Sequence, residues 1–169
     1  GPARVTNAGH KDRVRQVAFS PDGRRLASCG DDRRVRVWDP ASGQLVAKLR
    51  GHGNEVHRLA WDPGGGTLAT ACDDKILRIW DSATWRLRAS FKTTGWVRAL
   101  AWSGDGKQLA VGVPNQPICI LDAGSGKTTQ ELSFAFRGAS VVFDMSLTLS
   151  GPPETLICGA ACGLVYSWS

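Results

Sequence analysis

The sequence predicts an all-β fold made of a repeated unit of short strands, and three observations support this prediction. Short elements recur at a fixed distance, since Gly9-His10 returns as Gly51-His52, 42 residues further on. Turn-forming residues such as Pro21-Asp22-Gly23 separate the apolar runs. Apolar and polar residues alternate within runs such as 34–37, which is the period of a β-strand with one wet face. Such a repeat indicates a series of similar sheets.

The composition is that of a folded chain. Of 169 residues, 42% are hydrophobic, which is enough to bury a core and excludes a disordered or fibrous protein. No run approaches the roughly 18 apolar residues of a membrane span, and residues 1–20 lack the apolar centre of a signal peptide. We therefore expect a soluble chain with no membrane partner. The sequence opens at Gly1 rather than Met, which leaves its completeness open.

The first unit supplies four strands in order. A strand over 14–19 ends at a turn over 20–23, where proline presets φ and glycine accepts the left-handed conformation. The second strand contains 26–28, and the third covers 34–38 with its arginines expected on the wet face. The segment 44–49 supplies the fourth strand before the next Gly-His. Four antiparallel strands in a unit of this size make one blade of a β-propeller.

Three further copies follow the first. The second is intact and repeats Trp38-Asp39 as Trp80-Asp81. The third keeps a Ser-Gly-Asp-Gly turn at 103–106 but has Leu121-Asp122 in place of Trp-Asp, and the fourth ends at Trp168. We therefore predict one propeller segment over 1–169 with four recognisable blades. The predicted repeats cover approximately 9–50, 51–91, 92–133 and 134–169.

These motifs resemble those of the WD40 repeat family over almost the whole chain. In that family, the His of Gly-His, a strand Ser or Thr, a turn Asp and the Trp of Trp-Asp form a hydrogen-bonded tetrad. The resemblance implies two complete tetrads, one of His10, Ser28, Asp32 and Trp38, and one of His52, Thr70, Asp74 and Trp80. The third copy departs, with Thr93, Val111, Asn115 and Leu121 at the matching places, and the fourth keeps only Trp168. The resemblance also implies a larger WD40 ring of about seven blades.

Two groups of residues resemble catalytic motifs, and neither predicts an enzyme. His10, Ser28 and Asp32 are the residue types of a hydrolase triad, but the same set recurs 42 residues later, as expected of a structural network. The segment 124–128 resembles the end of a phosphate-binding loop, yet Leu121 stands where that loop needs a glycine. We therefore predict a non-enzymatic protein with no catalytic residue, cofactor or small-molecule substrate.

The five cysteines predict neither a disulfide scaffold nor a metal site. An odd number of mostly well-separated cysteines fits a reducing compartment better than a secreted scaffold. Only Cys158 and Cys162 are close together, and no second Cys or His pair lies near them to complete a zinc site. We therefore predict no metal.

Positive charge is concentrated in the first part of the chain. Residues 1–98 hold 18 of the 21 Lys and Arg but 10 of the 15 Asp and Glu. This asymmetry indicates contact with an RNA backbone or an acidic protein segment, although solvated strand faces would give the same count. The predicted interaction surface lies mainly on loops of one propeller face. It comprises Lys11, Arg13, Arg33, Arg34, His57, Lys75, Trp96 and Arg98.

The second and third copies also resemble a narrower group, the WD40 subunits of the THO complex. The resemblance rests on Gly51-His52-Gly53 and 78–81, and on the degenerate third copy, with Trp102-Ser103, 110–112 and 131–136. It implies a nuclear scaffold of the THO/TREX assembly, which acts in messenger RNA processing and export, with other protein subunits as partners. A generic WD40 adaptor in a ubiquitin ligase, ciliary or signalling assembly, in the nucleus or the cytoplasm, is the alternative.

Overall fold

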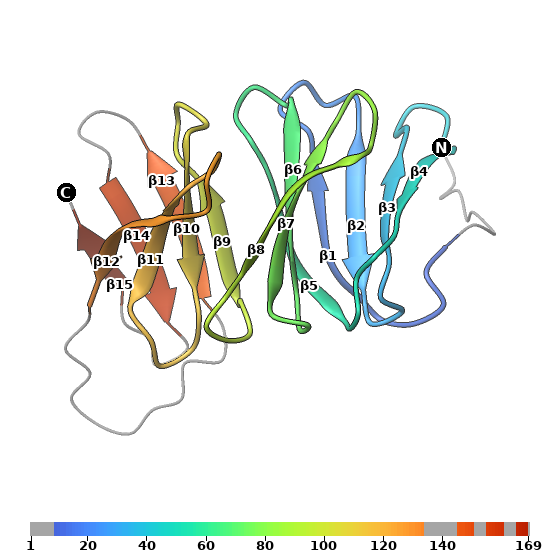
Figure 1. The fold of residues 1–169 in the computed structure, drawn as a ribbon. Helices are drawn as coiled ribbons and strands as arrows, with labels where there is room; N and C mark the ends of the chain where they lie inside the picture. The colour runs from blue at the N-terminus through green and yellow to red at the C-terminus, as the bar shows by residue number, and fades with distance from the viewer. Residues whose placement is uncertain (1–8, 134–144, 151–154, 161–164, 169) are drawn as a thin grey trace.

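The computed structural model describes residues 9–133, 145–150, 155–160 and 165–168, the last three ranges as strands only (Figure 1). These residues form fifteen strands and no helix, so no described helix could span a membrane. The strands are β1 (Val14–Phe19), β2 (Leu26–Gly30), β3 (Val35–Trp38), β4 (Leu45–Leu49), β5 (Val56–Trp61), β6 (Thr67–Cys72), β7 (Ile76–Asp81), β8 (Leu87–Lys92), β9 (Ala99–Trp102), β10 (Gln108–Gly112), β11 (Ile118–Asp122), β12 (Thr128–Leu132), β13 (Met145–Ser150), β14 (Thr155–Ala160) and β15 (Val165–Trp168).

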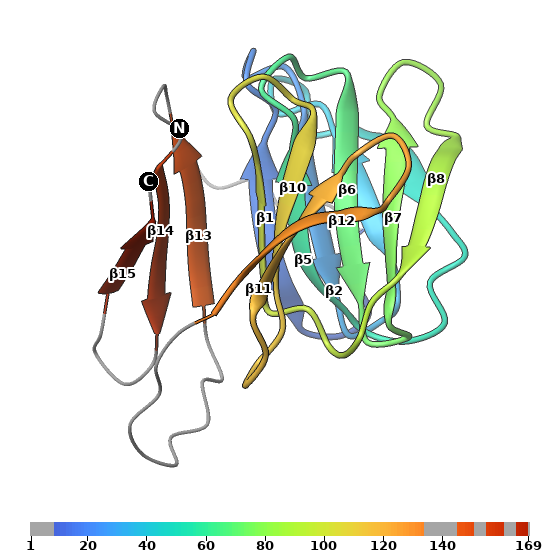
Figure 2. The same cartoon turned by 60° about the vertical axis from the view of Figure 1, so that its left-hand side comes forward.

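The strands form four antiparallel sheets, and each sheet uses strands that are consecutive in the sequence. The strand orders are β1-β2-β3-β4, β5-β6-β7-β8, β9-β10-β11-β12 and β13-β14-β15, and we call these sheets the first to fourth blades. Neighbouring blades meet mainly through their first strands, β1, β5, β9 and β13 (Figures 1 and 2). The predicted all-β fold is confirmed, and the arrangement is that of part of a β-propeller.

The pairing register repeats from blade to blade. Leu26 lies opposite Trp38 in the first blade, and Leu68 lies opposite Trp80 at positions 42 residues later. In the third blade the corresponding pair is Leu109 and Leu121, 41 residues after the second. Positions can therefore be compared between blades by adding 42 and then 41.

Tight turns fix this register. Between β1 and β2, Gly23 has a φ of 69° and donates its N–H to the Ser20 carbonyl at 2.8 Å. A longer turn joins the third and fourth strands of a blade, as between β3 and β4, where Gly43 donates to the Asp39 carbonyl at 2.8 Å. The segment 124–126 lies in the same kind of turn between β11 and β12, because Gly126 has a φ of 70° and donates to the Asp122 carbonyl at 2.8 Å. The predicted resemblance to a phosphate-binding loop is therefore only a resemblance, since a hairpin occupies the segment.

The hydrophobic core lies between blades. Small side chains of the first blade, such as Ala27 and Cys29, pack against larger ones of the second blade, such as Leu59 and Leu68. A second cluster joins the second and third blades in the same way. Its buried members are Ala69, Ala71, Leu77, Ile79, Val97, Trp102, Leu109, Val111, Val113 and Leu121.

One hydrogen bond recurs at both of these boundaries. The indole N–H of Trp61 donates to the Ala18 carbonyl of the first blade at 3.1 Å. The indole N–H of Trp102 donates to the Ala60 carbonyl of the second blade at 3.0 Å. Because both bonds start from the end of a first strand and reach the first strand of the preceding blade, they set how far one blade can slide along the next. Phe19 holds the same position in the first blade.

Candidate functional site

The predicted tetrad of the first blade is assembled as a continuous chain of hydrogen bonds. The Trp38 indole N–H donates to Ser28 Oγ at 2.8 Å. Ser28 Oγ also lies 2.8 Å from His10 Nε2, and His10 Nδ1 lies 2.8 Å from Asp32 Oδ1. The Arg36 guanidinium, which can only donate, also lies 2.8 Å from His10 Nδ1, so this nitrogen faces both a carboxylate and an arginine. Each of these polar groups therefore has a partner inside the blade.

The second blade has only part of this arrangement. The Trp80 indole N–H donates to Thr70 Oγ1 at 2.9 Å, and Thr70 Oγ1 lies 3.0 Å from His52 Nε2. His52 Nδ1 is buried and has no hydrogen-bond partner among the described residues, because Asp74 is instead bound by Arg78 and by the Gly53 N–H. Burial, and then the charge of Arg78, lower the pKa of His52 to about 4.

An arginine holds the aspartate of each tetrad, and the sequence prediction missed this role. Arg36 donates to Asp32 Oδ2 at 2.8 Å, and Arg78 donates to Asp74 Oδ2 at 2.8 Å. Both arginines are only 6% exposed, so the prediction that the arginines of the third strand lie on a wet face is wrong for Arg36. The sequence did contain a signal for this role, because an arginine recurs four residues after each tetrad Asp. For Asp74, burial acts against ionisation, but hydrogen bonds from Arg78 and Gly53 lower its pKa to about 2.

The third blade contains no tetrad. Val111 and Leu121 are buried where the second blade has Thr70 and Trp80. The Thr93 hydroxyl instead donates to the Gly95 carbonyl at 2.8 Å. A cavity of about 50 Å³ remains where these smaller side chains meet. Its lining is Lys92, Thr93, Thr94, Val111, Val113, Cys119, Leu121 and Thr128.

A network of ion pairs crosses the first three blades. Arg15 on β1 binds Asp31 of its own blade and Glu55 of the second blade, the latter at 3.2 Å. Arg98 at the entrance of the third blade reaches back to Asp73 of the second blade at 2.7 Å. His57 occupies the position on β5 that Arg15 and Arg98 hold in their blades, 42 and 41 residues away. The network therefore joins neighbouring blades at one edge.

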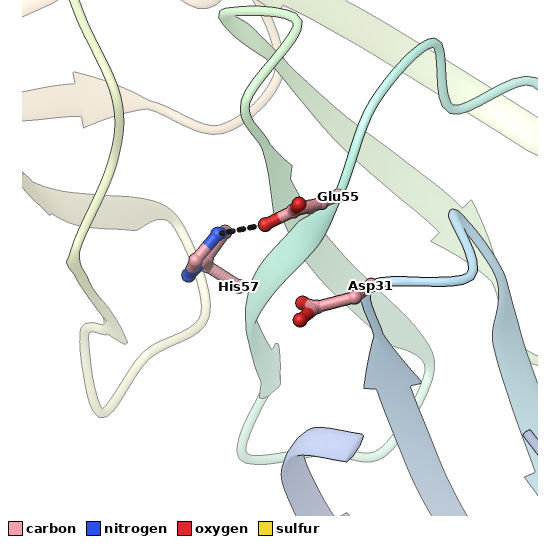
Figure 3. A group of neighbouring side chains, drawn as sticks. All are labelled: Asp31, Glu55 and His57. Carbon is pink, nitrogen blue, oxygen red and sulfur yellow. Dashed lines mark ion pairs between the residues drawn. The ribbon is translucent and has the colours of Figure 1, made fainter. Parts of the chain in front are cut away.

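Three members of this network have the donor types of a metal site. One ligand atom each of Asp31, Glu55 and His57 lies within 4.8 Å of the others (Figure 3). His57 Nε2 lies 3.4 Å from Glu55, without a well-aligned hydrogen bond. Carboxylate and imidazole groups suit zinc, but the Arg15 guanidinium already binds both carboxylates and balances their charge. We therefore interpret the group as part of the ion-pair network.

The predicted interaction surface is only partly available at the surface. Lys11, Arg13, Arg33 and Lys75 are exposed, and Arg34 is half-buried. Hydrogen bonds place the loops together, because Asp31 N–H donates to the Arg13 carbonyl and Thr93 N–H donates to the Lys75 carbonyl, both at 2.9 Å. Trp96 is 54% exposed, with the Arg98 guanidinium 5.8 Å from its ring centre.

Two members of the predicted surface have internal roles. His57 is 8% exposed, and burial followed by the charge of Arg98 lowers its pKa. Arg98 is committed to Asp73 as well as to the Trp96 ring. These two residues are therefore not free contact groups. The side chains of Cys158 and Trp168, and the whole of Cys162, lie outside what the structure describes.

These blades, which share one pairing register and have their loops at one edge, define a β-propeller repeat protein. The family model for the WD domain, G-beta repeat, matches residues 3–39 and 43–81. The model for the anaphase-promoting complex subunit 4 WD40 domain matches residues 85–143. The chain belongs to the WD40 repeat family.

Curated relatives match short parts of the chain. An uncharacterized WD repeat-containing protein, sll1491 of Synechocystis, is 51% identical over 45 residues, 26% of this chain and 13% of the relative. A probable cytosolic iron–sulfur protein assembly protein, the CIAO1 homolog of Ixodes scapularis, is 50% identical over 40 residues, 24% of this chain and 13% of the relative. Human striatin-4 is 59% identical over 34 residues, 20% of this chain and 4% of the relative. The chain thus matches only a small part of each relative.

Proposed function

We propose that this chain is a non-enzymatic scaffold for protein–protein interaction. The observation that carries the proposal is the hydrogen bonding of Ser28, the one hydroxyl in the triad-like group of the first blade. Ser28 Oγ accepts from Trp38 and faces His10, and the residue is 4% exposed, so its hydroxyl is engaged in the internal hydrogen bonds of the blade. A nucleophile needs both a base and access to substrate. The polar residues of the blade therefore hold the fold, and its loops are left for binding.

We infer that the loop edge binds an acidic protein segment. Lys11, Arg13, Arg33 and Lys75 are exposed there, and no described acidic side chain forms an ion pair with any of them. Binding to single-stranded RNA would favour several exposed aromatic platforms, and Trp96 is the one large exposed aromatic among the described loop residues of this edge. An acidic peptide needs only the cations and one apolar contact.

Charge reversal tests this surface. We expect Arg13→Glu, Arg33→Glu and Lys75→Glu together to weaken the capture of partners at least tenfold, whereas Arg24→Glu in the β1–β2 turn leaves it unchanged. The readout is quantitative mass spectrometry of proteins captured with the full-length protein. Fluorescence anisotropy with a single-stranded RNA in low and physiological salt is the second arm. Binding of RNA, rather than protein, that the triple variant abolishes would contradict the acidic-segment proposal.

The assembly that we propose for this scaffold is the THO/TREX complex in the nucleus. Its support is the resemblance of the degenerate third repeat, and the curated relatives above carry the names of other proteins. Affinity purification of the native full-length protein, with identification of the co-purifying subunits, is the test. Recovery of ubiquitin-ligase or ciliary components without export factors, or a cytoplasmic location of the tagged protein, would contradict the assignment.

A further inference from the structure

The outer strands of the first two blades carry exposed cations that the loop edge does not account for. β4 and β8 are the outermost strands of their sheets, at the opposite edge from the first strands through which the blades meet (Figures 1 and 2). The segments 44–50 and 86–92, which contain these strands, hold no Asp or Glu. We call the five exposed cations of these segments the basic rim, which comprises Lys48, Arg50, Arg86, Arg88 and Lys92.

The charges of the basic rim are not balanced inside the fold. Arg36 and Arg78, on the neighbouring strands, bind the tetrad aspartates, but no described acidic side chain forms an ion pair with any of the five rim residues. The third blade lacks such a rim, because its matching segment 127–133 holds one lysine and one glutamate, Lys127 and Glu131. Since β12 pairs in the same way as β4 and β8, the fold of a blade does not require these cations.

The spacing of the rim suits a partner with regularly repeated negative charges. In β8, Arg88, Ser90 and Lys92 are exposed, and the residues between them are half-buried. In the same way, Lys48 and Arg50 are exposed on either side of a buried residue. Residues two positions apart in a strand lie roughly 7 Å apart. Such cations can contact several phosphates of one nucleic-acid backbone at the same time.

The aromatic side chains of this region are already packed. Trp85 and Phe91 are half-buried. The Trp85 ring meets Trp61 edge-on at 6.0 Å, and the Phe91 ring lies so close to Gly126 that a Cβ there would collide with it. The bases of a single strand would therefore have no stacking platform, and a protein partner would have no aromatic anchor. A double helix needs neither, because its bases are stacked inside and its phosphates face outward.

We propose that the basic rim binds double-stranded RNA through its sugar–phosphate backbone. This surface is separate from the loop edge, so it does not depend on the acidic protein segment proposed there. Ser90 favours RNA over DNA, because its exposed hydroxyl, between Arg88 and Lys92 in the sequence, can donate to and accept from a 2′-hydroxyl, which DNA lacks. Gln44, exposed just before β4, supplies an amide with the same capacity.

The salt dependence of binding tests the proposal. Fluorescence anisotropy of the full chain with a labelled RNA duplex is measured between about 50 and 200 mM salt. Each neutralised phosphate of a duplex contributes about −0.9 to the slope of log K against log salt concentration, so five rim contacts predict a slope of about −4 to −5. The triple variant Arg86→Gln, Arg88→Gln and Lys92→Gln should make the slope shallower by about 3 and raise the Kd roughly tenfold or more.

A matched control removes the same number of charges from exposed positions outside the rim. The control variant combines Arg24→Gln, Lys107→Gln and Lys127→Gln, and it should keep the slope and the Kd of the wild type. Circular dichroism of both variants checks that the fold is unchanged. Equal losses in the two variants would reduce the effect to net charge and would overturn the proposal. A single-stranded RNA, or a DNA duplex of the same sequence, that binds as tightly as the RNA duplex would also overturn it.

Discussion

The second and third blades share a fold but not the polar chemistry inside it. Their strands pair in the same register, 41 residues apart, and both pack through a first strand that ends in Trp. The second blade holds Thr70, Asp74 and Trp80, and the third blade holds Val111, Asn115 and Leu121 in their places. Replacing both partners of a buried hydrogen bond by apolar groups costs little, whereas removing one costs much. The comparison teaches that strand register and packing make a blade, and that the tetrad is an optional polar addition.

The largest expected effect on stability distinguishes the equivalent turn positions of the second and third blades, Asp74 and Asn115. Asp74→Ala should lower the free energy of unfolding by about 3 kcal/mol, because it leaves the buried charge of Arg78 without its carboxylate. Asn115→Gly at the equivalent position should change it by less than about 0.5 kcal/mol, because a φ of 61° suits glycine. Urea unfolding of both variants is the measurement. Equal losses would show that these positions are not equivalent.

The next effect is a pH dependence carried by the second blade. The pKa of His52 is about 4 in the fold and about 6.5 in the unfolded chain, so the unfolded chain binds more protons between these values. The contribution of neutral His52 to the free energy of unfolding is therefore fully present above pH 6.5, and it falls as the pH drops toward 4. The expected loss attributable to His52 between pH 7 and pH 5 is about 2 kcal/mol.

The variant His52→Gln isolates this contribution. Burial also lowers the pKa of His57, so part of the dependence should remain in this variant. Thr93 occupies the position in the third blade that corresponds to His52, so that blade should add no comparable pH-dependent contribution to stability. Unfolding curves at pH 7 and pH 5 for the wild type and the variant are compared. An unchanged pH dependence in His52→Gln would contradict the assigned burial of a neutral imidazole.

The smallest effect tests whether the third blade can regain polar chemistry. Val111→Thr alone should cost about 1–2 kcal/mol, because it buries a hydroxyl without a partner. Combined with Leu121→Trp, which fills the adjacent cavity of about 50 Å³, the new indole N–H can donate to that hydroxyl. We expect a favourable coupling of about 1 kcal/mol in the double-mutant cycle. Leu121→Phe is the control, since it adds an aromatic ring without an N–H, and equal coupling would exclude the hydrogen bond.

The repeat made much of the fold predictable. Residues that recur at an interval of 42 positions, such as Trp38 and Trp80, indicated which strands pair and which side chains face each other. The partners of Asp32 and Asp74 were harder to predict. An arginine in a strand of alternating apolar and polar residues has the pattern of a solvated face. The burial of Arg36 comes from the carboxylate beside it, which spacing within a strand does not reveal.

Side-chain contacts between strands, within a blade and between blades, were the least predictable part of the site. His57 has the sequence context of a loop-edge residue, yet Glu55, Asp73 and the neighbouring blades bury it. Trp85 has a φ of 56° at a turn position where the first blade has Gly43 at 72°. Its ring meets Trp61 edge-on at 6.0 Å, which stabilises an unfavourable backbone conformation. No pattern within a single repeat predicts a partner on another strand of the sheet.

In each indole–carbonyl bond between blades, the donor side and the acceptor side differ in how a substitution can affect them. The donors are the side chains of Trp61 and Trp102, but the acceptors are the main-chain oxygens of residues 18 and 60. Every amino acid carries that oxygen, so no point substitution in the accepting blade deletes it. Each of these bonds therefore depends on the identity of one side chain, on one side of the boundary. A blade without a tetrad, such as the third, is still joined to its neighbour by this bond.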